Sequence, residues 1–178
     1  MKSKSAFTDA VPGNTEKVFQ KAGIKLLHGT ARFISVDEVE ICPDLTIRAE
    51  HIVIATGSRT AKLDFPGSEF TITSDEFLKL DHMPRRVAFI GGGYIAMEFA
   101  HVAHSAGAAV SVLQRTDRIL KRFDAELVNR LVDASIASGI TVTKGFDTSS
   151  IEKVRGSFIV HGSGGRTQLI KADLVVNC

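Results

Sequence analysis

The chain has 178 residues and a formal net charge of +2, with 24% charged and 44% hydrophobic residues. This length allows one complete hydrophobic core and a second, partial one, and the composition argues against a disordered chain. The small net charge gives no electrostatic reason to expect a nucleic-acid partner.

The first part of the chain predicts one short helix followed by a β-rich segment. The helix is expected to begin at Asn14 and to end at Gly23. A linker that contains Pro66 and Pro84 leads from this segment into a region with a different pattern. The strand-like runs of the first part are residues 24–28, 30–34, 38–41, 45–48 and 51–55.

The middle of the chain predicts a strand, a glycine turn, a helix and a second strand. Gly91, Gly93 and Ala96 form a G-x-G-x-x-A pattern between the first strand and the helix. This order is the context that a dinucleotide-binding fingerprint requires. The strands are residues 86–90 and 108–113, and the helix covers residues 94–105 and is ended by Gly107.

Each position of the glycine turn has a physical role. Gly91 lets the chain turn tightly out of the strand, and Gly93 lets the backbone approach a pyrophosphate closely. Ala96 allows the helix to pack close to the sheet. The start of the helix then offers unpaired N–H groups to the phosphates. The alternative is a glycine-rich turn with a purely structural role.

A basic cluster past the second strand bears on the choice of dinucleotide. An NAD site has an acid about 20 residues past the glycines to bind the ribose 2′-hydroxyl, but the neutral Gln114 occupies this place. A 2′-phosphate would instead gain charge-assisted bonds from basic side chains. We therefore expect NADP rather than NAD. The alternative is a solvated basic loop, whose charge Asp117 partly offsets. The cluster consists of Arg115, Arg118, Lys121 and Arg122.

The last third of the chain completes an α/β pattern. Asp124 is a plausible N-cap for a helix that runs to Ser138 and is closed by Gly139. The expected fold is a Rossmann-like parallel sheet with helices and an antiparallel β-meander. The remaining strands are residues 140–143, then the meander at 151–155, 157–161 and 167–170 with a turn at Gly162-Ser163-Gly164-Gly165, and finally 174–176.

Two stretches give the chain a family resemblance. Residues 90–98 (Ile-Gly-Gly-Gly-Tyr-Ile-Ala-Met-Glu) closely resemble the NADPH-binding turn of glutathione reductase and its relatives, the flavin-dependent pyridine nucleotide–disulfide oxidoreductases. Residues 51–59 resemble the family's A-T-G segment, where the chain leaves the FAD domain. Pro66-Gly67 and residues 72–75 follow at the family's spacing. The resemblance implies a partial FAD-domain segment at 1–58, as a β-rich remnant, and an NAD(P)H-binding domain at 59–178.

The resemblance also implies roles for single residues. Tyr94 matches the tyrosine that covers the flavin, and Glu98 matches the glutamate that pairs with a lysine beside it. Arg115 and Lys121 match the two positions that bind the 2′-phosphate. Tyr94 could otherwise be a surface aromatic residue and Glu98 an ordinary polar-face residue. The expected cofactor-binding residues are Gly91, Gly93, Tyr94, Ile95, Ala96, Glu98, Arg115, Arg118 and Lys121, with Ala55, Thr56 and Gly57 from the A-T-G segment.

Other parts of the family pattern have no match here. The C-x-x-x-x-C redox pair, the glycine turn for FAD and the dimerisation domain with its catalytic histidine are missing. We therefore expect an internal piece of an oxidoreductase that binds a nucleotide without turnover, with FAD and the missing domains belonging to the full-length enzyme. The alternative is a non-catalytic nucleotide-binding module, or one that needs a partner chain. An incomplete FAD part should expose apolar edges, so self-association is expected.

The cysteines and histidines predict no further site. Cys42 and Cys178 fit neither a C-x-x-C pair nor a metal cluster, and they suit a reducing cytoplasm. Glu98, His101 and His104 have the Glu-x-x-His spacing of di-iron bundles, but no second such motif occurs, so no metal is expected. The same polar residues interrupt the apolar stretch there, and neither a membrane span nor a signal peptide is expected.

Overall fold

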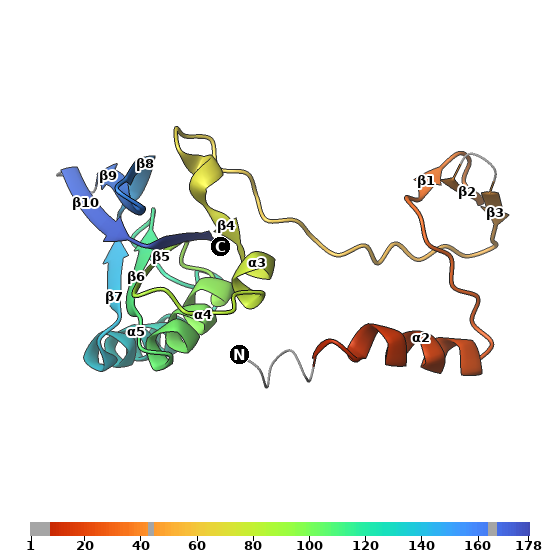
Figure 1. Ribbon diagram of the computed structural model, residues 1–178, viewed down its shortest axis with the longest axis horizontal. Coiled ribbons are helices and arrows are strands. Elements are labelled where there is room, and N and C mark those ends of the chain that lie inside the picture. Colours follow the sequence, from red (N-terminus) through yellow and green to blue (C-terminus); the bar gives the residue numbers. More distant parts are fainter. Residues whose placement is uncertain (1–7, 43–44, 164–166) are drawn as a thin grey trace. The chain divides into compact units, whose positions relative to one another are not determined.

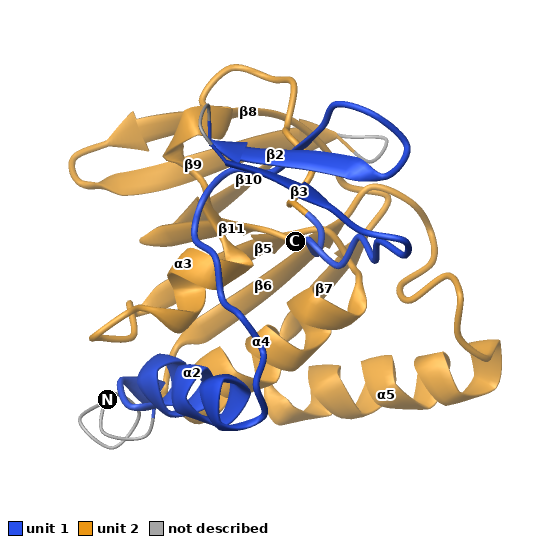
Figure 2. Cartoon of the chain, turned by 90° about the vertical axis from the view of Figure 1, so that its right-hand side faces the viewer, with its two compact units in different colours: residues 1–58 blue, residues 59–178 orange. Residues whose placement is uncertain are grey.

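The computed structural model describes residues 8–42, 45–163 and 167–178. The chain forms two compact units, Met1–Ser58 and Arg59–Cys178, which we call unit 1 and unit 2 (Figure 2). Among the described helices, none is long and apolar enough to cross a membrane.

Unit 1 contains a helix and a small antiparallel sheet. Helix α2 spans Val11–Lys21. The sheet has the order β1-β2-β3, and ion pairs join Arg32 to Glu40 at 2.8 Å and Arg48 to Asp37 at 2.6 Å. None of the described side chains of unit 1 is buried. The strands are β1 (Arg32–Phe33), β2 (Glu38–Cys42) and β3 (Leu45–Arg48).

Several predictions for unit 1 were wrong in detail. Helix α2 begins at Val11 rather than Asn14, because Pro12 suits the first turn of a helix. Residues 24–28 and 51–55 form no strand, and 30–34 contribute only β1. Strands need neighbours that complete their hydrogen bonds, and the apolar side chains of Val53 and Ile54 remain 87% and 71% exposed.

Unit 2 contains a five-stranded parallel sheet with the order β4-β11-β5-β6-β7 (Figure 1). A second sheet, β10-β9-β8, is an antiparallel meander. This α/β arrangement confirms the predicted fold class. The strands are β4 (Ile72–Thr73), β5 (Arg86–Ile90), β6 (Ala109–Gln114), β7 (Thr141–Lys144), β8 (Asp147–Val154), β9 (Ser157–Ser163), β10 (Thr167–Ala172) and β11 (Leu174–Asn177), and the helices are η1 (Ser68–Phe70), α3 (Ser74–Leu78), α4 (Tyr94–Ser105) and α5 (Ala125–Ser138).

The side chains of β5 alternate between two apolar cores. Val87 and Phe89 pack in the core that includes α4 and α5. Ala88 and Ile90 pack in the core that includes the meander. Both faces of a parallel strand are covered in this way, which accounts for the nearly continuous apolar sequence of β5.

The predicted turn at residues 162–165 was partly wrong. Strand β9 continues through Gly162 and Ser163, and Gly164 and Gly165 lie outside the described residues. A side chain at Gly162 would overlap the buried ring of Phe146. Gly162 therefore serves close packing between the two sheets rather than a turn.

Candidate functional site: the glycine turn and its pocket

The glycine turn follows β5 directly. Gly91 has φ +110°, a conformation that L side chains rarely adopt, and a Cβ there would overlap the carbonyl oxygen of Cys178. Its N–H donates to the Leu113 carbonyl oxygen at 2.9 Å. A Cβ at Gly93 would instead meet nothing within 4 Å. The backbone before α4 is thus fixed at Gly91 and open at Gly93.

Helix α4 begins at this open position. Gly93 is its N-cap in an extended conformation, and no side chain caps the helix. Its first N–H groups therefore point out of the turn with the positive end of the helix dipole. Ala96 is fully buried against the sheet, Ile95 is half-buried, and Glu98 is exposed. This geometry fits a pyrophosphate, because both the space at Gly93 and the donors are present.

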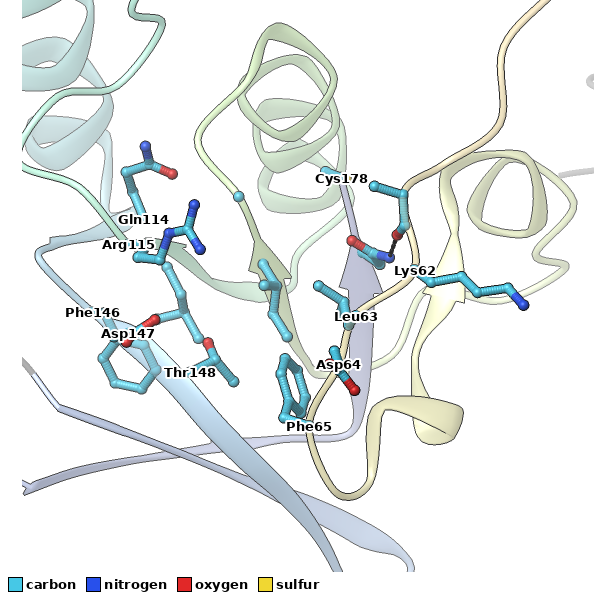
Figure 3. A pocket seen from close by; sticks show the side chains of 15 residues that line it. Lys62, Leu63, Asp64, Phe65, Gln114, Arg115, Phe146, Asp147, Thr148 and Cys178 are labelled. Carbon is cyan, nitrogen blue, oxygen red and sulfur yellow. Dashed lines mark hydrogen bonds between the residues drawn. The ribbon is translucent and has the colours of Figure 1, made fainter.

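A pocket of about 630 Å³ lies at the carboxyl ends of β5, β6 and β11 (Figure 3). The chain runs from β5 to β6 on one side and returns to β11 on the other, so this edge is the point where strand order reverses. Ligands of open α/β sheets bind in such a crevice, and the volume is in the range of cofactor sites.

Besides the ends of β5 and β11, three segments line the pocket. Gln114 and Arg115 line it at the end of β6, and Phe146, Asp147 and Thr148 line it just before and at the start of β8 (Figure 3). Residues 61–65 form the remaining wall. The Asn177 side-chain amide donates to the Ala61 carbonyl oxygen at 2.8 Å, which ties this wall to β11.

Two of these segments, residues 61–65 and 146–148, were not predicted from the sequence. The only local signal for residues 61–65 is Pro66-Gly67, which follows them: Gly67 has φ +84° and packs so closely on Ile151 that a Cβ would overlap its carbonyl oxygen. The Ile151 N–H donates to the Pro66 carbonyl oxygen at 2.9 Å. The linker is therefore fixed to the meander at this point.

The basic cluster follows β6 at the edge of the pocket. Arg115, Lys121 and Arg122 are exposed. Arg118 is exposed as well, but its guanidinium Nη2 donates to the Phe123 carbonyl oxygen at 2.7 Å. The loop thus uses one of its four cations in an internal hydrogen bond.

Other predicted residues lie outside the pocket. Tyr94 is 59% exposed at the start of α4. Ala55, Thr56 and Gly57 belong to unit 1, where all three are exposed. The site described here is therefore built from unit 2 alone.

Among the described residues, His101, His104 and the two cysteines belong to no group of metal ligands. The His101 Nε2 atom lies 2.9 Å from the Ser135 hydroxyl, which joins α4 to α5. The Nδ1 atom of His104 is buried without a hydrogen-bond partner in the described structure. No group of three metal-ligating side chains occurs among the described residues. Cys42 and Cys178 are both free thiols, and burial raises the pKa of Cys178 to about 12, so its thiol stays protonated at neutral pH.

A parallel sheet with a glycine turn at the end of β5 is the architecture of a dinucleotide-binding domain. Residues 4–178 match the family described as "Pyridine nucleotide-disulphide oxidoreductase", and the chain belongs to this family. Members of the family depend on FAD and a pyridine nucleotide. The predicted resemblance is thereby confirmed.

The similar proteins are oxidoreductases. Glutathione reductase of Nostoc sp. is 34% identical over 155 residues, covering 87% of this chain and 34% of the relative. Glutathione reductase of Burkholderia cepacia is 32% identical over 170 residues, covering 96% of this chain and 38% of the relative. Mercuric reductase of Bacillus cereus is 30% identical over 154 residues, covering 85% of this chain and 24% of the relative. The chain thus spans well under half the length of these relatives.

A solved structure supports the fold. The HOCl-induced flavoprotein disulfide reductase RclA of Escherichia coli matches with a TM-score of 0.83 over 98% of this chain and 41% of that chain. The two sequences are 23% identical.

Proposed function

We propose that the chain is the NADP(H)-binding part of an FAD-dependent, glutathione reductase-like oxidoreductase. The observation that carries this proposal is the pocket at the carboxyl edge of the sheet, with Gly91 of the glycine turn on one side and Arg115 on another. Gly91, Gly93 and Ala96 shape the turn, and the N–H groups of α4 donate to pyrophosphate oxygens.

The basic cluster selects the nucleotide. Arg115 and Lys121 supply charge-assisted hydrogen bonds to a 2′-phosphate. The ammonium group of Lys121 is a point charge and gives less directional recognition than a guanidinium. Since Gln114 is neutral, no carboxylate repels the phosphate. These features favour NADP over NAD.

In the full-length enzyme, a reduced nicotinamide supplies a hydride to FAD, and the electrons pass to a disulfide or a related acceptor. Tyr94 and Glu98 lie one turn apart on α4 and are both exposed, so they are available to a flavin-bearing domain. We assign no catalytic residue to this chain and expect it to bind nucleotide without turnover. Two free thiols support a cytoplasmic location.

The nucleotide assignment is tested by calorimetric titration with 2′-phospho-AMP and with AMP. The Arg115→Ala, Lys121→Ala variant should bind 2′-phospho-AMP about 10- to 100-fold more weakly, with AMP affinity nearly unchanged. The matched control is Lys153→Ala, Lys171→Ala, which removes two exposed cations from the meander. Equal binding of both ligands by the unmodified chain would discard the NADP assignment and leave a dinucleotide domain.

The exposed side chains of unit 1 suggest which partner the chain needs. Its described side chains are all at least partly exposed, so we propose that a separate flavin-binding segment covers them and that Ala55, Thr56 and Gly57 contact FAD there. Alone, the chain should self-associate through these apolar side chains. Sedimentation should show oligomers that become a flavin-containing complex when a segment with the family's FAD turn is added. A stable monomer that gains no flavin would favour the alternative, a non-catalytic binding module.

A further inference from the structure

The loop after β6 is built onto the glycine turn. The Leu120 N–H donates to the Gly92 carbonyl oxygen at 2.9 Å. Ile119 is almost fully buried, and a Cβ at Gly92 would overlap its Cδ1 atom and crowd the Gln114 side chain. Leu120 adopts φ +48°, which few non-glycine residues do. The glycine turn, which would hold the pyrophosphate, and the loop after β6, which would hold the 2′-phosphate, are therefore packed against each other.

The side chain of Gln114 stabilises the fold of this loop by hydrogen bonds to two of its residues. Its Nε2 atom donates to the Thr116 hydroxyl at 2.7 Å and to the Arg118 carbonyl oxygen at 3.0 Å. The Thr116 hydroxyl donates to the same carbonyl oxygen at 3.3 Å. On the far side of the loop, the Arg118 guanidinium donates to the Phe123 carbonyl oxygen. The side-chain amide of Gln114 thus uses both of its hydrogens within the loop.

The two residues between β7 and β8 fix the base of the loop. The Phe146 N–H donates to the Gln114 carbonyl oxygen at 2.9 Å, and the Gly145 N–H donates to the Thr116 carbonyl oxygen at 3.0 Å. The backbone of Gln114 is therefore set by the sheet, and its side chain determines how the following residues fold back.

We propose that Gln114 and Arg118 are positioning residues for nucleotide choice, which hold Arg115 and Lys121 at a fixed spacing before the ligand arrives. This inference rests on the proposed NADP site. It assigns Arg118 to holding the loop in place rather than to binding the phosphate directly. A glutamate at position 114 could not donate to the Arg118 carbonyl oxygen, and its charge would oppose a phosphate. Glutamine closes the loop without that charge. Preorganised cations bind more tightly because less conformational entropy is lost on binding.

The test measures the ratio of 2′-phospho-AMP to AMP affinity in Gln114→Leu, a variant of similar size without donors. The ratio should fall about threefold to tenfold, because the variant should lose more affinity for 2′-phospho-AMP than for AMP. The matched control is Gln168→Leu on the meander, which should leave the ratio unchanged. Arg118→Met provides a second variant in case Gln114→Leu folds poorly, and it should lower the ratio similarly.

A double-mutant cycle separates positioning from direct contact. In the Arg115→Ala, Lys121→Ala background, neither Gln114→Leu nor Arg118→Met should change the ratio further, because the cations through which they act are gone. An unchanged ratio in the single variants would overturn the proposal, and so would additive losses in the cycle, which would make Arg118 a direct ligand. A chain without any preference for 2′-phospho-AMP would instead refute the proposed function itself.

Discussion

Asp173 lies where three strands of unit 2 come together. The guanidinium of Arg86, at the start of β5, binds both of its carboxylate oxygens, and the hydroxyl of Ser157, at the start of β9, donates to one of them at 3.1 Å. The Asp173 N–H also donates to the Arg86 carbonyl oxygen at 2.9 Å. The hydrogen bond from Arg86 holds the pKa of Asp173 below its ordinary value of 3.8.

This ion pair makes the stability of unit 2 depend on pH. Because the carboxyl pKa is lower in the folded state, its contribution is complete above pH 3.8 and is lost as the pH falls through the folded pKa. Asp173→Asn should lower the melting temperature by about 3 °C at pH 7, since the pair is partly exposed. Between pH 5 and pH 2 the variant should lose less stability than the unmodified chain. Calorimetric melting checks this, and an identical pH profile in both would contradict it; Asp133→Asn is the control.

Helix α5 shows what a single cap contributes at the scale of an element. The Asp124 carboxylate accepts from the N–H groups of Glu126 and Leu127 at 3.0 and 3.1 Å. Asp124→Ala should therefore lower the free energy of unfolding by about 1 kcal/mol in urea titrations. Asp133→Ala, an exposed change in the middle of the same helix, should cost much less. Equal losses in the two variants would show that the cap is not the cause.

Local sequence signals predicted the central elements of unit 2 well, but β8 begins at Asp147 rather than at residue 151, and the linker holds β4 and α3, which were not predicted. Caps, glycine stops and buried apolar runs placed α4, α5, β5, β6 and β7 within about one residue, because these signals act over a single element. Residues 51–55 have the same apolar pattern as a buried strand but form none. Whether such a run becomes a strand depends on neighbouring strands, which its own residues do not encode.

The site could be predicted only in part, for a related reason. The glycine turn and the basic cluster are continuous in sequence, so their chemistry was visible without a structure. The wall formed by residues 61–65 depends on the contact of Asn177 with Ala61, which are far apart in the chain. The hydrogen bonds of Gln114 could not be predicted, because the sequence shows only that this position is neutral. Hydrogen bonding of a neutral side chain to its own loop leaves no distinct sequence pattern.

The position of β11 has a consequence for how the molecule forms. This strand follows the other strands of unit 2 in the sequence, yet it lies between β4 and β5, and Cys178 directly after it supplies the carbonyl oxygen against which Gly91 packs. During synthesis, β5, β6 and β7 can pair before β11 has left the ribosome, but the edge of β5 beside Gly91 stays open until then. Strand β11 pairs Leu174 with Val87, and these residues are far apart in the sequence. This pairing should therefore form more slowly than the local strand pairing of the meander. The proposed nucleotide site is therefore the last part of unit 2 to be completed, so nucleotide binding would indicate that the whole of unit 2 has folded.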